Sequence, residues 1–402
     1  RRGFLFPLIA APFFTIGIGE IGIRFLMAIS STGFIFVSYI LMTRFVEKKV
    51  ALLASICLTL SWILLFFSGR ILTDTTAAFF ILLSFLLFFD GYYLNRGNKL
   101  IYLSAAVFAI AVLTRMQSLM MVPAFFLVPF VKERFKMFSS RQIWKGVLVF
   151  IIIMLPQVFL YSSHYGNPIT DIGSYYLGIG EKAEETGNAR TISVDSLNYI
   201  FNLPYMLTNW MFYLFLVGFA LFFFDLFLGF DKIFQNEILQ KKFFVLSFLL
   251  CLFLVMGYVG SVSYVEQRYV AVGLPFLFMI SAFPLIKIRD YLEKNMSLSK
   301  TSSAACILII LLILMMPNII LAKNMIEEKK SSFIEVKEAG IWIKENSNQD
   351  EIIISASVPQ ITYYSERSTY PFDPGFYYGT KLGNPTFLKY SNDYDGFLKF
   401  IK

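Results

Sequence analysis

The stretch Ser68-Gly69-Arg70-Ile71-Leu72-Thr73-Asp74-Thr75-Thr76 lies between two long apolar runs of the chain. A helix of about 20 apolar residues is long enough to cross the hydrocarbon core of a bilayer. The stretch therefore marks a place where the chain leaves a membrane and enters it again, with a carboxylate at Asp74. This arrangement predicts a many-span membrane protein that carries a charged site at one membrane face.

The composition of the 402 residues supports this prediction. Hydrophobic residues make up 57% of the chain and charged residues 15%, and the mean hydropathy is +0.66. Soluble domains carry about 25% charged residues. The net charge is +8, but the basic residues lie in short loops between apolar runs rather than in aromatic-rich surface patches. The charge therefore does not indicate a nucleic-acid-binding protein.

The apolar runs predict an all-α polytopic membrane domain over residues 24–323. Arg115 interrupts the run from 100 to 131, and two short helices that meet at Thr114–Gln117 keep this cation out of the bilayer centre. Residues 1–23 contain prolines and glycines and predict an interfacial or juxtamembrane segment, with an extra span over residues 3–19 as the alternative. The ten predicted spans are 24–45, 50–67, 75–94, 100–114, 117–131, 147–163, 205–227, 243–260, 269–286 and 302–322.

Basic residues are divided unequally between the loops that join these spans. One set of alternate loops carries 17 lysines and arginines, whereas the other set carries five. Basic loops remain on the cytoplasmic side of a membrane. We therefore expect Asp74, the long loop 164–204 and the chain after residue 323 to lie on the extracytoplasmic side. The five basic residues expected there are Arg70, Arg115, Lys182, Arg190 and Arg268.

Residues 324–402 predict a small soluble α/β domain on the extracytoplasmic side. Apolar residues recur at helical spacing from Phe333, and Glu351–Ser355 is typical of a short buried strand. A second helix is expected to begin near Pro359. Prolines and glycines after Tyr364 indicate turns.

Cysteine and histidine are too few for a zinc-type metal centre. The three cysteines, Cys57, Cys251 and Cys306, lie in apolar runs without CxxC spacing, and His164 is the single histidine. A divalent cation bound by outer-loop carboxylates stays open. The sequence predicts no other cofactor.

Asp74 is the first candidate for chemistry. A helix N-cap at Thr73 or Asp74 would explain the same polar residues, because a carboxylate also suits the positive end of a helix dipole. Arg70, Arg115 and Arg268 are candidate ligands for a lipid phosphate, since the planar guanidinium can bind two phosphate oxygens. Snorkelling to lipid headgroups is the alternative explanation for these arginines.

Five further residues are candidates for substrate binding, and each has a simpler explanation. Glu266 lies just before an apolar run, and a solvated loop end alone would explain a charged residue there. A lone histidine at the end of a span is often structural. The tyrosines suit an aromatic belt at the membrane interface, or stacking on a sugar ring or prenyl chain. The candidates are Glu266, Tyr269, His164, Tyr175 and Tyr176.

Several motifs together resemble the GT-C glycosyltransferases, in the group that contains dolichyl-phosphate-mannose protein mannosyltransferases and polyprenyl-phosphate-sugar transferases. The order and the sidedness of the motifs agree with that group, and the resemblance covers nearly the whole chain. The motifs are Phe6-Pro7-Leu8-Ile9-Ala10, Gly19-Glu20-Ile21-Gly22-Ile23-Arg24, Arg70-Ile71-Leu72-Thr73-Asp74, Leu113-Thr114-Arg115, His164-Tyr165-Gly166-Asn167-Pro168 and Glu266-Gln267-Arg268-Tyr269.

The resemblance implies an enzyme that moves a sugar from a polyprenyl- or dolichyl-phosphate donor to a protein, lipid or glycan acceptor on the extracytoplasmic face. It implies that Asp74 is an acidic member of the site and that Arg268 approaches the lipid phosphate. The family's general base is expected upstream of residue 1, because Glu20 lies too close to the next span to replace it. Arg115 stands where many relatives carry a lysine.

Two other functions stay open at this point, a lipid-linked glycan transporter or flippase and a non-catalytic membrane scaffold. Transporters tend to carry ionisable groups near mid-membrane and to show repeated halves. In this sequence the charges collect at the ends of apolar runs, and no repeat is evident. These features favour the glycosyltransferase.

Overall fold

The computed structural model describes residues 3–165, 197–233, 235–260 and 266–371. These residues form two units, one that extends to Lys323 and one that begins at Asn324. Within the described ranges, seven helices are long and apolar enough to cross a membrane, and a bent pair of helices is an eighth candidate. The first unit is therefore an integral membrane domain, and the prediction of an all-α polytopic fold is confirmed.

Helices occupy all ten predicted spans, but several of the spans are divided or begin with a 3₁₀ turn. The span 50–67 is divided into α3 (Lys48–Leu60) and α4 (Trp62–Ser68), which meet at 52°. The run 100–114 is α6 (Asn98–Thr114), an apolar helix shorter than the full spans. The run 117–131 begins with the 3₁₀ turn η2 (Met116–Met121) before α7 (Val122–Glu133). Fewer than ten long, uninterrupted spans result because polar residues such as Ser61 and Arg115 interrupt the helices.

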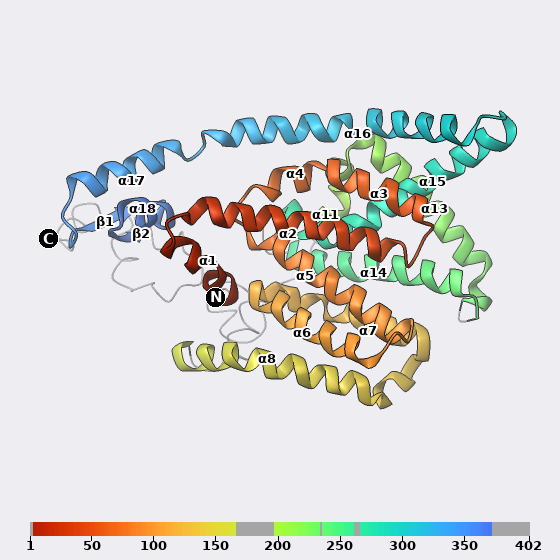
Figure 1. Ribbon diagram of the computed structural model, residues 1–402, viewed down its shortest axis with the longest axis horizontal. Coiled ribbons are helices and arrows are strands. Elements are labelled where there is room, and N and C mark those ends of the chain that lie inside the picture. The colour runs from red at the N-terminus through yellow and green to blue at the C-terminus, as the bar shows by residue number, and fades with distance from the viewer. Residues whose placement is uncertain (1–2, 166–196, 234, 261–265, 372–402) are drawn as a thin grey trace. The chain divides into compact units, whose positions relative to one another are not determined.

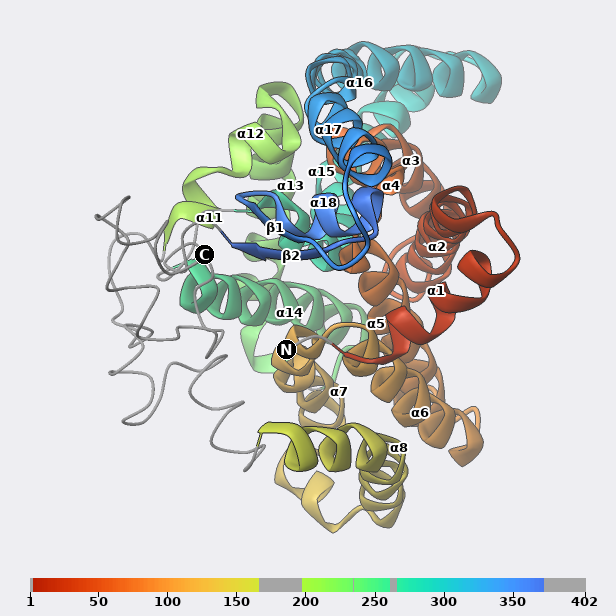
Figure 2. The ribbon, with the colours of Figure 1, turned by 90° about the vertical axis from the view of Figure 1, so that its left-hand side faces the viewer.

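Four helices of the first unit pack side by side, α2 (Gly19–Met42), α5 (Thr73–Phe88), α6 and α8 (Arg141–Tyr165) (Figures 1 and 2). α2 begins five residues before the predicted span, and the short helix α1 (Leu5–Thr15) precedes it. α5 is apolar on every face and is largely buried, as expected for a helix at the centre of a bundle.

A π-helical turn, η1 (Phe89–Tyr93), continues α5 at the end away from Asp74. It carries Asp90, whose carboxylate accepts two hydrogen bonds from the guanidinium of Arg44 and one from Arg96, each at 2.8 Å. Charges therefore gather at both ends of α5, and each set is paired by its own arginines.

The rest of the first unit surrounds the buried helix α15 (Leu274–Asn295), which the 3₁₀ turn η7 (Gln267–Gly273) precedes. α13 (Asn209–Leu228) crosses α15 closely at Gly218, where a Cβ atom would lie 2.0 Å from the carbonyl oxygen of Ile280. The remaining elements of this unit are η3 (Arg134–Ser139), α11 (Asn198–Phe201), α12 (Leu203–Leu207), η6 (Phe230–Lys232), α14 (Glu237–Gly260) and α16 (Lys300–Lys330).

Aromatic rings fill the centre of the first unit and join three of its helices. Phe85 of α5 lies between Phe244 and Phe248 of α14, with ring centroids 5.3 and 5.2 Å apart. Phe248 in turn contacts Phe276 of α15 at 4.6 Å. Aromatic pairs at these separations stabilise a core beyond the area that they bury, so these rings hold α5, α14 and α15 in fixed positions.

The second unit contains α17 (Ile334–Asn346), β1 (Ile352–Ser355), α18 (Val358–Ser365) and β2 (Ser368–Pro371). The two strands are parallel, with Ile352 opposite Ser368. Arg367 donates hydrogen bonds to the Lys344 and Ser347 carbonyls at the end of α17. Both predicted helices and the predicted strand are present, whereas β2 was not predicted because its sequence lacks an apolar run.

Candidate functional site

The site is built around Asp74 in the first turn of α5. Its side chain is 7% exposed and forms ion pairs with the guanidinium groups of Arg115 and Arg268. Neither Thr73 nor Asp74 caps the helix, since Leu72 is the N-cap residue and no side chain caps it. The N-cap interpretation is therefore wrong, because the carboxylate is turned to two arginines instead.

Arg115 reaches Asp74 from the break between α6 and η2. The backbone of Arg115 is extended, with φ −150° and ψ 112°, which ends α6 and directs the side chain to α5. Its Nε donates a hydrogen bond to Oε1 of Gln117 at 3.2 Å, and its guanidinium lies 4.6 Å from the ring centroid of Tyr269. The predicted break at Thr114–Gln117 is confirmed, and it brings a cation into contact with Asp74.

Arg268 lies on η7, between two carboxylates. Its Nε is 3.7 Å from Oδ2 of Asp74 and 3.5 Å from Oε2 of Glu266, distances too long for strong hydrogen bonds. The Nε atom is buried and has no hydrogen-bond partner among the described residues. A buried donor without an acceptor costs free energy, so this nitrogen is available to an oxygen that enters the site.

Arg70 lies in the loop between α4 and α5, with its guanidinium 4.0 Å from the ring centroid of Phe66. Burial lowers the pKa of Arg70, the positive charges of Arg268 and Arg24 lower it further, and Glu266 opposes them. Arg268 and Arg24 are thus each close enough to Arg70 to repel it. A region where cations repel one another favours an anionic ligand.

Arg24 ties the start of α2 to the same loop. It donates a hydrogen bond from Nη1 to the carbonyl oxygen of Gly69 at 2.7 Å and pairs with Glu20 at 2.5 Å. Arg24 belongs to the motif Gly19–Arg24 but is not among the predicted site residues. The sequence did contain a signal for the pair of Arg24 with Glu20, because residues four positions apart lie on the same face of a helix.

Tyr199 of α11 supports the backbone of Glu266. The Tyr199 hydroxyl accepts a hydrogen bond from the Glu266 amide at 3.3 Å and lies 3.5 Å from the Glu266 carbonyl oxygen. Burial raises the pKa of Tyr199 to about 12, so this hydroxyl stays protonated at neutral pH. The Glu266 side chain is 42% exposed and therefore reaches the solvent. No sequence pattern connected these two residues, which are 67 positions apart.

The structure thus gathers most of the residues that the sequence singled out. We use the name arginine cluster for Arg70, Asp74, Arg115, Glu266, Arg268 and Tyr269. The side chain of His164, at the end of α8, and the tyrosines Tyr175 and Tyr176 lie outside the described residues. Among the described residues, no group of three or more His, Cys, Asp or Glu side chains could hold a metal ion.

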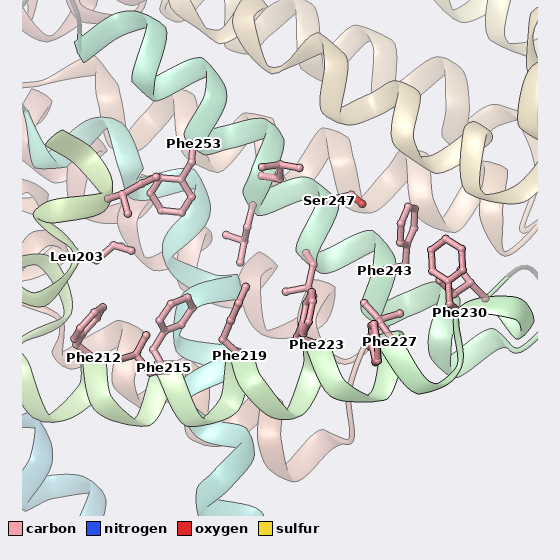
Figure 3. Close-up of a pocket in the computed structure, with 17 residues that line it drawn as sticks. Leu203, Phe212, Phe215, Phe219, Phe223, Phe227, Phe230, Phe243, Ser247 and Phe253 are labelled. Atoms are coloured by element: carbon pink, nitrogen blue, oxygen red, sulfur yellow. The ribbon is translucent and has the colours of Figure 1, made fainter. Parts of the chain in front are cut away.

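An apolar groove of about 670 Å³ lies between α13 and α14 (Figure 3). Figure 3 shows a row of five phenylalanines along α13 that point towards α14, and neighbouring rings in this row are 5.8 to 6.4 Å apart. Of the described lining residues, Ser247 alone has a polar side chain. The row consists of Phe212, Phe215, Phe219, Phe223 and Phe227.

The groove begins close to the arginine cluster. Ile200 and Leu203 line it, and they belong to α11 and α12. Tyr199, which precedes Ile200, is the residue that binds the backbone of Glu266. A polar site and an apolar groove therefore share the short segment from Tyr199 to Leu203.

Comparison with protein families gives a match over the first part of the chain. Residues 1–159 match the family described as dolichyl-phosphate-mannose-protein mannosyltransferase, which is less than half of the 402 residues. Comparison with curated proteins gives no significant match.

Solved structures match over most of the chain. ArnT from Cupriavidus metallidurans bound to undecaprenyl phosphate is 12% identical, with a TM-score of 0.58, over 89% of this chain and 73% of that one. The Archaeoglobus fulgidus oligosaccharyltransferase AglB, in complex with an inhibitory peptide and a dolichol-phosphate, is 13% identical, with a TM-score of 0.60, over 90% and 55% of the respective chains. The chain has the GT-C fold.

The expected resemblance is therefore confirmed at the level of the fold. The family match and the GT-C fold together indicate a membrane glycosyltransferase. The chain spans about half the length of the archaeal oligosaccharyltransferase, and the complex of that enzyme with zinc and sulfate shows the same proportion, at 52%.

Proposed function

We propose that the protein transfers a sugar from a polyprenyl-phosphate donor to an acceptor on the extracytoplasmic face of the membrane. The observation that carries this proposal is the arginine cluster, in which Arg115 and Arg268 share the buried carboxylate of Asp74 and the Arg268 Nε has no hydrogen-bond acceptor within the described part of the chain. A phosphate oxygen supplies the acceptor that this nitrogen lacks.

The cluster suits the departure of a lipid phosphate. Negative charge grows on the phosphate as the bond to the sugar breaks, and cations already fixed in a dry site stabilise that charge without reorganisation. Arg268 is held between Asp74 and Glu266, and Arg70 lies close enough to repel it. We assign the phosphate to Arg268 and Arg70, with Arg115 behind them.

Asp74 acts in this proposal as a positioning residue for the two arginines. An ionised carboxylate accepts hydrogen bonds and can receive a proton only by giving up part of its pairing. Asp74 is buried, and both of its oxygens face guanidinium groups. The acceptor proton is therefore not expected at Asp74. Glu266, whose side chain is 42% exposed, is the carboxylate of the cluster that meets the solvent and stays a proposed substrate-binding residue.

The groove between α13 and α14 accommodates the prenyl chain of the donor. α13 has 20 residues and so extends about 30 Å at 1.5 Å per residue, close to the thickness of the hydrocarbon core. The apolar lining offers no partner to a headgroup, and the segment from Tyr199 to Leu203 joins the groove to the cluster. A donor with its phosphate at Arg268 would therefore place its tail along the phenylalanine row.

Two comparisons support a lipid-phosphate donor. ArnT is described with undecaprenyl phosphate bound, and AglB with a dolichol-phosphate and an inhibitory peptide. In our proposal the membrane domain of residues 24–323 holds the site, and the domain of residues 324–402 lies on the same extracytoplasmic side. His164, Tyr175 and Tyr176 of the loop 164–204 stay proposed substrate-binding residues.

The test compares Arg268→Ala and Arg268→Lys with the unchanged protein in lipid nanodiscs. We expect Arg268→Ala to weaken binding of undecaprenyl phosphate about ten- to a hundredfold, the effect of losing a hydrogen bond to a charged group. Lysine keeps the charge without the planar fork, so we expect an intermediate loss. Sugar transfer from a polyprenyl-phosphate donor should fall in the same order.

Arg96→Ala is the matched control, because Arg96 pairs with Asp90 at the other end of the α5–η1 helix. We expect it to leave both binding and transfer unchanged. Full binding and full transfer in Arg268→Ala would contradict the assigned site. Movement of a lipid-linked glycan across vesicles without any transferred product would contradict the enzyme itself.

A further inference from the structure

A buried amide connects two interruptions in the helices of the first unit. Asn318 follows Pro317 inside α16 and is completely buried. Its Oδ1 accepts a hydrogen bond from the backbone N–H of Trp62 at 3.2 Å. Its Nδ2 donates to the Leu207 carbonyl at 3.0 Å and to the Thr208 hydroxyl at 2.9 Å. One side chain thus binds α4 and the junction of α12 with α13.

The groups that Asn318 binds have lost their helical partners. At Ser61 the backbone is extended, which separates α3 from α4 and leaves the N–H of Trp62 without a helical acceptor. Thr208 has φ 68° and separates α12 from α13, which frees the Leu207 carbonyl. Unpaired N–H and C=O groups are costly in apolar surroundings. Asn318 therefore stabilises both breaks at once.

Trp62 forms a second link between the same two segments. Its indole Nε1 donates to the carbonyl oxygens of Tyr205 and Met206 at 3.2 and 3.1 Å. Its ring centroid lies 5.1 Å from that of Tyr205. Trp62 is fully buried, so α4 and α12 are held together by hydrogen bonds that water does not weaken.

These two segments carry different parts of the proposed site. α4 leads directly into the loop of Arg70 and then to Asp74, whereas α12 follows Tyr199 and contributes Leu203 to the groove. We propose that Asn318 is a positioning residue, which sets the separation between α4 and the α11–α12 segment and so tunes the affinity for the lipid phosphate. The link to lipid affinity rests on the proposed function, whereas the coupling of the two breaks does not.

The test uses Asn318→Leu, which is similar in size but has no polar atoms, and Trp62→Phe, which keeps a ring and loses the indole N–H. Hydrogen–deuterium exchange in nanodiscs follows residues 58–68 and 203–212. Undecaprenyl phosphate affinity is measured on the same samples. We expect Asn318→Leu to raise exchange at both breaks and to weaken affinity about three- to tenfold, less than the full effect of its three lost hydrogen bonds because Asn318 acts on the site only through α4 and α12. Trp62→Phe should also raise exchange at both breaks and weaken the affinity, but each change should be smaller than in Asn318→Leu.

Ser84→Ala is the matched control, because Ser84 forms a buried hydrogen bond with Ser104 between α5 and α6, away from both breaks. We expect it to leave exchange at both breaks and lipid affinity unchanged. Faster exchange with unchanged affinity in Asn318→Leu would overturn the positioning role, and unchanged exchange would overturn the coupling. If Asn318→Leu does not fold, Trp62→Phe decides between the same outcomes.

Failure of the proposed function gives a different result. In that case the unchanged protein does not bind undecaprenyl phosphate, yet exchange at residues 58–68 and 203–212 still shows whether Asn318 couples the two breaks. Exchange that rises at one break only would overturn the coupling, because a shared amide must affect both.

Discussion

At the scale of single residues, the balance of charge around Asp74 controls the site. Arg115 and Arg268 each bring a positive charge to a carboxylate that is 7% exposed, and their own side chains are 16% and 22% exposed. Removing one partner from such a set leaves charges without compensation in a poorly hydrated place. The carboxylate is therefore needed for stability as well as for the position of both arginines.

Asp74→Asn tests this role. The substitution keeps the shape of the side chain and removes its charge, so Arg115 and Arg268 repel each other without a counter-charge. Breaking a buried pair costs about 3–5 kcal/mol, and partial exposure of the arginines places the expected loss near the lower value. Thermal unfolding in detergent should show a lower midpoint, and sugar transfer should be lost.

Asp225→Asn is the comparison for that substitution. Asp225 pairs with Lys242 but is 49% exposed, and exposed pairs contribute about 0–1 kcal/mol. Its unfolding midpoint should remain close to that of the unchanged protein. An equal shift in the two variants would show that Asp74 has no special role in stability.

At the scale of elements, interruptions of helices create the site. Arg115 is available because α6 ends at Thr114, and Arg70 is available because α4 ends at Ser68. Arg268 lies on a 3₁₀ turn ahead of α15. Continuous spans would place these cations in hydrocarbon at a cost of several kcal/mol, whereas the breaks allow them to meet at Asp74.

The groove can be tested by filling it. Leu250 lines the groove and is 62% exposed, so Leu250→Trp should occupy part of its volume. We expect weaker binding of long-chain undecaprenyl phosphate, about threefold or more, with unchanged binding of a ten-carbon prenyl phosphate that reaches only the cluster. The difference between the two chain lengths is the measured quantity.

Leu254→Trp is the control, because Leu254 is 66% exposed on the same helix and does not line the groove. It should bind both chain lengths as the unchanged protein does. Equal losses for the long and the short chain in Leu250→Trp would mean that the prenyl chain lies elsewhere.

At the scale of the whole molecule, the two ends of the α5–η1 helix carry different charged sets. The arginine cluster surrounds Asp74 at one end, and Arg44 and Arg96 bind Asp90 at the other. Sixteen residues separate the two aspartates, about 24 Å along a helix, which is close to the thickness of the hydrocarbon core. Arg44 and Arg96 belong to the basic loops that predict the cytoplasmic side.

This sidedness is open to measurement by cysteine labelling. In a background without Cys57, Cys251 and Cys306, Gly69→Cys should react with a membrane-impermeant maleimide added to intact cells. Lys99→Cys should react only after the membrane is opened. Gly69 is a suitable position because no atom lies within 4 Å of an added Cβ. The reverse labelling pattern would place the cluster on the cytoplasmic side.

The sequence by itself predicted the membrane class, the helical fold and the elements on which the charged residues lie. These properties are local. The length of an apolar run follows from the thickness of the bilayer, and charged residues lie in loops because a charge in hydrocarbon costs free energy. The chemistry of an arginine or a carboxylate at a span end is also local. For this reason Asp74, Arg115 and Arg268 could be chosen before any contact between them was known.

The tertiary structure decided which of these residues meet and what supports them. Tyr199 lies 67 positions from the residue that it holds, and Asn318 lies 256 positions from Trp62. No periodicity links such pairs, because their contacts depend on how whole helices pack and where each helix breaks. The groove likewise exists only between two helices, since a row of phenylalanines on one helix does not show what faces it. Packing therefore turned separate span ends into one candidate site.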